Sequence, residues 1–151
     1  MKKYVIFLLI ILLSGCIVPP TTEPTATVTL PFVMTSADNP FAPTSEDSGL
    51  PPMGVVLISS DLVERTDLSQ VRVALNLLGS LPSTCSELRL EVNRPNDQYQ
   101  IFVEAYSLEN PNPKCDNVFQ QFNASVLLGV YSPGRYTVWV NQGFIGDFVA
   151  E

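Results

Sequence analysis

Apolar and polar residues alternate along most of the chain after residue 53. Successive side chains of a β-strand point to opposite faces, so strict alternation predicts strands with one buried face. No part of this region repeats its apolar residues every 3.6 positions, as an amphipathic helix does. The alternating runs occupy 71–77, 88–93, 99–105, 122–128, 136–141 and 144–149, and a shorter apolar run covers 55–58. We therefore expect about seven strands.

Turn-forming residues separate these runs. Gly, Pro, Asn and Asp gather at 79–82, 94–97, 110–113, 132–134 and 141–143. Glycine and asparagine tolerate the backbone angles of tight turns, and proline presets one of them. Short strands joined in this way are typical of an antiparallel β-sandwich. Within it, the strands over 86–93 and 98–107 are expected to pair as a hairpin around Pro95 and Asn96.

The segment 132–138 supports this fold class. Its sequence, SPGRYTV, resembles the Gly-x-Tyr-x-Val entry to a late strand of immunoglobulin-like domains. The resemblance implies a single immunoglobulin-like antiparallel β-sandwich over 53–151. It also implies that Tyr136 forms a tyrosine corner, in which the hydroxyl bonds to nearby backbone. Val138 stands where that family has its second cysteine.

The residues between 16 and 52 have a different composition. Eight of the 13 prolines lie there, among many threonines and serines, and no apolar period persists. Proline cannot continue a helix or a central strand. This stretch is predicted to be a disordered linker.

The first 16 residues form an export signal. Lys2 and Lys3 precede the apolar stretch 4–13, which is shorter than the roughly 20 residues of a membrane-spanning helix. The following Leu13-Ser14-Gly15-Cys16 resembles the lipobox of bacterial lipoproteins. The resemblance implies that residues 1–15 are a signal peptide and that Cys16 becomes the lipidated first residue. The protein is then expected to be exported and held at the bacterial membrane by acyl chains such as palmitate, with its domain on the extracytoplasmic side.

Two cysteines remain after Cys16. Lipidation of Cys16 leaves Cys85 and Cys115 as an even pair. Outside the cytoplasm such a pair is most simply a disulfide, and two buried thiols are the alternative.

The charge and the missing histidine exclude several functions. The chain has 15 acidic and 8 basic residues, so a nucleic-acid partner, which needs a basic surface, is not expected. It contains no histidine, which removes Ser-His and Cys-His catalysis and the commonest metal ligand. Glu87, Arg89 and Glu91 share one strand face, as in a solvated ladder of charges. We expect no enzyme activity, no cofactor and no metal.

Three aromatic residues are the candidate binding surface. Phe102, Tyr106 and Trp139 each lie one position away from residues predicted to face the core, so they point outward. They form either a recognition surface for an envelope protein or glycan, or a patch packed under the linker, a loop or an edge strand.

These expectations combine into a lipoprotein of the cell envelope that displays a small binding module. Its partners are the membrane, through the lipid on Cys16, and an envelope protein or glycan. Two alternatives stay open, namely a protease-inhibitor-like module that uses the loop 110–116, and a purely structural envelope protein.

Overall fold

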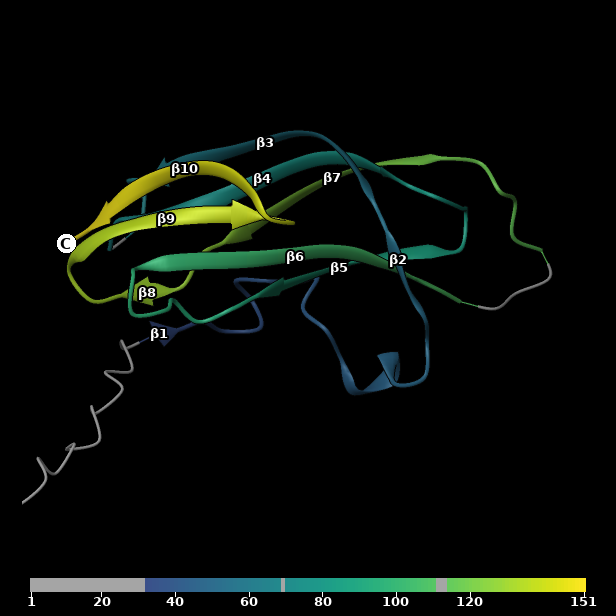
Figure 1. The fold of residues 1–151 in the computed structure, drawn as a ribbon, viewed down its shortest axis with the longest axis horizontal. Helices are drawn as coiled ribbons and strands as arrows, with labels where there is room; N and C mark the ends of the chain where they lie inside the picture. Colours follow the sequence, from purple (N-terminus) through teal and green to yellow (C-terminus); the bar gives the residue numbers. More distant parts are fainter. Residues whose placement is uncertain (1–31, 69, 111–113) are drawn as a thin grey trace, which may run out of the picture.

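The structure is a computed structural model that describes residues 32–68, 70–110 and 114–151 (Figure 1). The predicted signal peptide, Cys16 and the first part of the predicted linker lie outside the described residues. The regular elements of the described chain are strands, apart from one short 3₁₀ helix, η1. The elements are β1 (Phe32–Val33), η1 (Ser45–Asp47), β2 (Pro52–Gly54), β3 (Val56–Arg65), β4 (Arg72–Leu81), β5 (Ser86–Val92), β6 (Gln100–Glu109), β7 (Gln120–Leu127), β8 (Val130–Tyr131), β9 (Gly134–Val140) and β10 (Gly143–Ala150).

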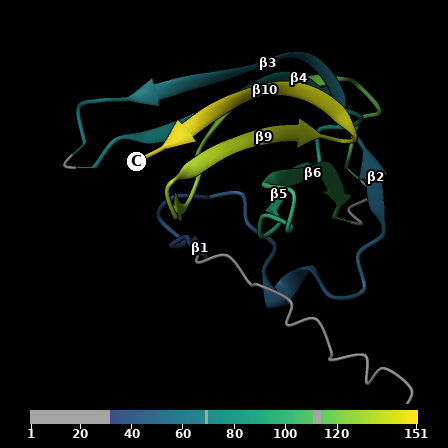
Figure 2. The same cartoon turned by 60° about the vertical axis from the view of Figure 1, so that its left-hand side comes forward.

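The strands form a β-sandwich, as the alternation predicts. A five-stranded sheet has the order β10-β9-β6-β2, with β5 also paired to β6, and a three-stranded sheet has the order β3-β4-β7. The short strands β1 and β8 form a separate pair. All pairings are antiparallel except β6 with β9, because the chain crosses to β7 and β8 before it returns to the larger sheet. The larger sheet curls so that β10 lies against β3 (Figure 2).

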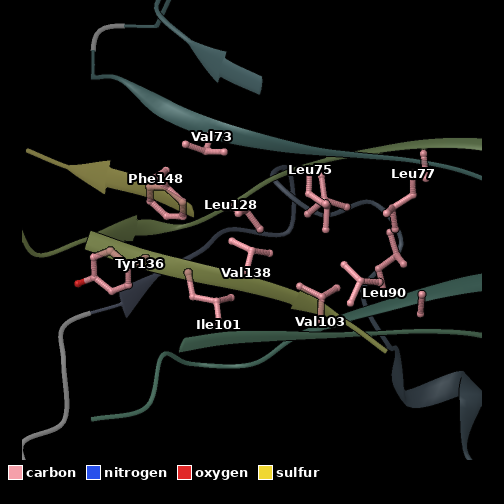
Figure 3. Close-up of a cluster of buried hydrophobic side chains, with 14 of the residues drawn as sticks. Val73, Leu75, Leu77, Leu90, Ile101, Val103, Leu128, Tyr136, Val138 and Phe148 are labelled. Carbon is pink, nitrogen blue, oxygen red and sulfur yellow. The ribbon is translucent and has the colours of Figure 1, made fainter. Parts of the chain in front are cut away.

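The core lies between the two sheets. Side chains from β4 meet those from β6 and β9 in a layer that excludes water (Figure 3). Leu75, Ile101 and Val138 are fully buried, and each belongs to one of the alternating runs. Burial of one such side chain stabilises the fold by about 1.5–3 kcal/mol.

Strand β3 is longer than its apolar run. The sequence predicts a strand only around 55–58, whereas β3 continues to Arg65 with an irregular register between Leu57 and Ser59. The extension is polar because β3 is an edge strand, and most of its residues are exposed. Leu62 is one of its few partly buried side chains and packs against the core.

The prediction of a disordered linker over 16–52 is wrong for its described part. Residues 34–50, which we call the strap, join the free edges of the two sheets. The carbonyl oxygen of Asp38 accepts a hydrogen bond from Leu127 N of β7 at 2.9 Å, and that of Phe41 accepts one from Leu90 N of β5 at 2.9 Å. The buried Asn39 side chain also donates to Leu90 O at 2.6 Å. Proline lacks only the backbone donor, so a proline-rich segment can still bond through carbonyls and side chains.

Two ion pairs hold the strap to the strands. Arg72 lies 2.8 Å from Asp38, and Arg89 lies 2.7 Å from Asp47, with little exposure of these side chains. The hydrogen bond from Arg72, together with the N–H and hydroxyl of Thr35, lowers the pKa of Asp38 to about 2. The fold therefore includes described residues upstream of 53, from residue 32 onward.

The disulfide lies at the start of β5. Cys85 and Cys115 are bonded, which agrees with their pairing from the sequence. Beside them, Thr84 N donates to Asp116 O at 3.1 Å, and Asp116 N donates to the Thr84 hydroxyl at 2.9 Å. The segment after residue 113 is thus fastened to the start of β5. Residues 111–113 of the predicted inhibitory loop lie outside the described residues.

Tyr136 makes the contact expected of a tyrosine corner. Its ring is fully buried, and its hydroxyl donates to the carbonyl oxygen of Ser132 at 3.0 Å. The rings of Tyr131 and Phe148 pack against it, with centroid separations of 4.9 and 5.6 Å.

Candidate functional site

A groove of about 790 Å³ lies on the outer face of the larger sheet. Its floor is β6, one side is β5, and the strap with β2 closes one end. The turn between β9 and β10 borders it as well. It is lined by Asp47, Leu50, Pro52, Glu91, Asn93, Phe102, Val103, Glu104, Ala105, Tyr106, Leu108, Asn141 and Gln142. Figure 1 shows β5 beside β6 and the coiled turn of η1 near β2.

The floor of the groove presents three side chains of β6. Phe102, Glu104 and Tyr106 are spaced two residues apart and point outward, while the intervening Val103 and Ala105 are buried. The sequence predicts the outward direction of both aromatic residues, and the structure places both of them in this groove.

Asn141 builds the rim of the groove. The β9 strand pairs with β6 only as far as Val103, and β2 pairs with it only from Tyr106. In the gap, the Asn141 amide bonds to the backbone of Ala105: its Nδ2 donates to the carbonyl oxygen at 2.9 Å, and its Oδ1 accepts from the N–H at 2.8 Å. The side chain thus completes the ladder of β6.

The same residue forms the hairpin turn. Asn141 and Gln142 have φ angles of 46° and 69°, and they connect Val140 to its partner Gly143. Two left-handed residues in succession make the tight turn whose twist fits an antiparallel hairpin, and asparagine adopts this conformation readily. The turn holds Gln142 against the groove.

Two carboxylates lie side by side in the groove, on the neighbouring strands β5 and β6. The antiparallel register of β5 and β6 places Glu91 directly opposite Glu104, where Cβ atoms are about 5 Å apart. Both residues are exposed, and within the part of the chain that the structure describes neither side-chain carboxylate makes a hydrogen bond or an ion pair. Like charges at such positions destabilise a strand pair. The repulsion between these carboxylates therefore lowers the stability of the strand pair, and no contact in the described fold explains why both are present.

Arg89, on the same strand face as Glu91, makes no hydrogen bond or ion pair with these two glutamates. Arg89 makes two hydrogen bonds to Asp47, at 2.8 and 2.7 Å, and one to Glu87 at 2.9 Å. A fourth goes to the Leu88 carbonyl oxygen at 3.0 Å. A guanidinium has five donors, so this residue is almost fully engaged.

All charged residues that line the groove are acidic. Burial raises the pKa of Tyr106, and the carboxylates of Glu91 and Asp47 raise it further. The hydrogen bonds from Arg89 hold the pKa of Asp47 well below its ordinary value, so Asp47 stays ionised. The Tyr106 hydroxyl therefore remains protonated at neutral pH, since burial and these carboxylates outweigh the opposing charge of Arg89.

An aromatic row continues the groove across the sheet. Phe102 stacks on Trp139 at a centroid separation of 6.2 Å, and Trp139 meets Phe144 edge to face at 5.3 Å. These residues are neighbours in register on β6, β9 and β10. Trp139 is half-buried and lies beside the groove rather than in it, so the structure brings Phe102 and Tyr106 into one site and Trp139 against its edge.

Sequence reasoning missed several residues of this site. Phe144 could have been found because it lies opposite Trp139 once the turn 141–142 is taken as a two-residue hairpin. Glu104 could have been placed opposite Glu91 by fixing the register of the predicted 86–107 hairpin. No feature of the sequence placed Asp47 in the groove, because the strap was expected to be disordered.

The described residues contain no group of three or more His, Cys, Asp or Glu side chains placed to bind a metal ion. Across the same residues, no helix is both long enough and apolar enough to span a bilayer.

Comparison with known proteins identifies a domain family. No curated protein and no solved structure matches the chain. A family model described as the ORF11 β-sandwich domain matches residues 75–150. The match begins within β4 and ends at the last residue of β10, so it contains β5, β6 and the 141–142 turn but not the strap. This chain belongs to the ORF11 β-sandwich domain family.

Proposed function

We propose that this protein is an exported, lipid-anchored component of the cell envelope that binds a ligand in the groove on β6. The groove carries the proposal, because it combines an exposed aromatic floor with polar groups that have no partner within the described fold. Its floor strand is hydrogen-bonded on both sides, which makes the site rigid before any ligand arrives. Rigid sites lose less entropy when they bind.

The anchor rests on the lipobox and on the cysteines. Of the chain's three cysteines, two form the disulfide, so Cys16 is left over for another role. A disulfide agrees with an oxidising compartment outside the cytoplasm. An acidic chain is not attracted to anionic lipid headgroups, so the acyl chains alone must hold the protein at the membrane. Stable attachment then needs two or three acyl chains on Cys16.

Metabolic labelling tests the anchor. Cells that express the full chain are fed palmitate with an alkyne tag, and the protein is compared with the Cys16→Ser variant. The proposal expects labelling of the first and none of the second, together with release of the variant from membranes. Equal labelling of both, or an unprocessed chain that starts at Met1, would contradict the anchor.

Photocrosslinking in intact cells tests the groove. p-Benzoylphenylalanine is introduced at Gln142, which lines the groove, and in a separate strain at Asn123, which is exposed on the other sheet. The proposal expects an adduct from position 142 only. The adduct should disappear with Phe102→Ala, which removes part of the groove floor, and remain with Leu78→Ala. Leu78 is the matched control because it lies on the other sheet and is exposed to the same extent, 38% against 36%.

Mass spectrometry of the adduct then shows whether an envelope protein or a glycan is bound. If no adduct forms at position 142 while Cys16→Ser still releases the protein from membranes, the groove is not a binding site. The purely structural alternative then holds.

A further inference from the structure

We infer that the groove recognises an organic cation, an alkylammonium group held by Glu91 and Glu104 against the ring of Phe102 or Tyr106. This inference rests on the proposed function and adds the chemical class of the ligand. It concerns the described groove and is independent of the lipid anchor.

The charges favour a cation. Glu91 and Glu104 lie opposite each other, and the ion pairs of Arg89 are directed to Asp47 and Glu87 instead. A positive group between the two carboxylates would replace their mutual repulsion by two attractions. An anion would meet three carboxylates in the same groove, including Asp47.

The aromatic residues favour an organic cation. Phe102 and Tyr106 stand two residues before and after Glu104 on one strand face, about 7 Å from it along the strand. The face of an aromatic ring attracts ammonium groups within about 6 Å of its centroid. A cation placed between Glu104 and one of these rings can therefore reach that ring while it pairs with the carboxylates.

A bare metal ion fits this site less well. Calcium takes 6–8 oxygen ligands, whereas the floor offers two opposed carboxylates flanked by rings. The volume of about 790 Å³ also exceeds what one ion fills, and it leaves room for the chain that carries the ammonium group. The amide side chains of Asn93 and Gln142 line the same groove and can bond to polar parts of that chain.

The single tryptophan provides a direct measurement. Trp139 is the only tryptophan of the chain and stacks on Phe102, so its fluorescence reports on the groove. The full chain is titrated with N-acetyl-lysine methylamide, cadaverine and choline, which represent a basic peptide, a free diamine and a quaternary ammonium group. Each is compared with an uncharged isostere: N-acetyl-6-hydroxynorleucine methylamide, pentane-1,5-diol and 3,3-dimethylbutan-1-ol. Isothermal titration calorimetry supplies an independent affinity.

The inference expects saturable binding of at least one cation, roughly tenfold or more tighter than its uncharged isostere and weaker at high salt. Glu91→Gln with Glu104→Gln should weaken the binding by about tenfold or more. The matched control, Asp61→Asn with Glu64→Gln on β3, changes the net charge equally on the other sheet and should leave the affinity within about twofold. The groove variant relieves a repulsion, so it should remain folded, which its thermal unfolding verifies.

The outcomes separate this inference from the proposed function. If an uncharged isostere binds as tightly as its cation, the groove is a binding site but the cation inference is wrong. If no cation binds, or if both double variants weaken binding equally, the inference is also wrong, and crosslinking at Gln142 decides the proposed function separately. The probe that binds most tightly shows whether the ligand of the groove is a basic peptide, a free amine or a quaternary ammonium compound.

Discussion

Replacement of Asn141 tests how the groove is built. Asn141→Ala removes both hydrogen bonds between the side-chain amide and the backbone of Ala105. Each such bond contributes about 0.5–1.5 kcal/mol net. Alanine at a φ of 46° costs about a further 1 kcal/mol, because left-handed backbone crowds its Cβ. We therefore expect a loss of about 2–4 kcal/mol, which is a large fraction of the 5–15 kcal/mol that holds a typical domain together.

Chemical denaturation of the full chain, followed by Trp139 fluorescence and by circular dichroism, measures this loss. Asn141→Gly is the matched control, since glycine accepts the left-handed backbone but also lacks the amide. It should lose about 1–3 kcal/mol, and the difference between the two variants isolates the backbone cost. A loss below about 0.5 kcal/mol in both variants would refute the view that the amide completes the ladder of β6.

Three further predictions concern the strap, the disulfide and the buried tyrosine. Removal of the Cys85–Cys115 bond opens a loop of 30 residues and should cost about 3–4 kcal/mol in denaturation with reductant; no difference with and without reductant would contradict this. Asp38 has a folded pKa of about 2 against an ordinary 3.8, so its ion pair stabilises the fold above about pH 4 and is lost as the pH falls towards 2. Urea midpoints should thus fall less steeply over this window in Asp38→Asn than in the natural chain, and equal slopes would count against the ion pair. Tyr136→Phe deletes the hydroxyl bond to Ser132 and should cost about 1 kcal/mol or somewhat more, seen as a thermal midpoint lower by a few degrees; an unchanged midpoint would contradict a structural role for that hydroxyl.

Local patterns predicted most of the sheet. In β4, Leu75 and Leu77 flank the polar Asn76, and this period of two depends only on adjacent positions. The turn at Asn141 could also be predicted, because asparagine readily adopts left-handed backbone conformation. The length of edge strand β3 was underestimated, because most of its side chains are exposed and need not be apolar.

The strap could not be predicted in this way. Its proline-rich composition is typical of disorder, whereas its order comes from contacts distant in sequence: Asn39 bonds to a residue 51 positions away. No local pattern encodes such a contact. The segment is ordered because a few carbonyls and side chains meet the open edges of β5 and β7.

The candidate site was partly predictable. The outward direction of Phe102, Tyr106 and Trp139 follows from alternation. Their grouping with Glu104 required the hairpin register, and the role of Asn141 required the parallel pairing of β9 with β6, which no sequence motif announces. Glu91 was correctly assigned to a charged strand face, but its opposite neighbour was not identified.

The most direct test of the central claim is to map where a cation binds. In the ¹⁵N-labelled full chain, N-acetyl-lysine methylamide is added while the backbone amide resonances are followed. We expect the largest shifts at Phe102, Glu104 and Tyr106, and unchanged resonances at Asn76 and Ser125 on the outer face of the other sheet. Shifts confined to that other sheet, or no shifts at all, would contradict the assignment of the groove on β6 as the binding site.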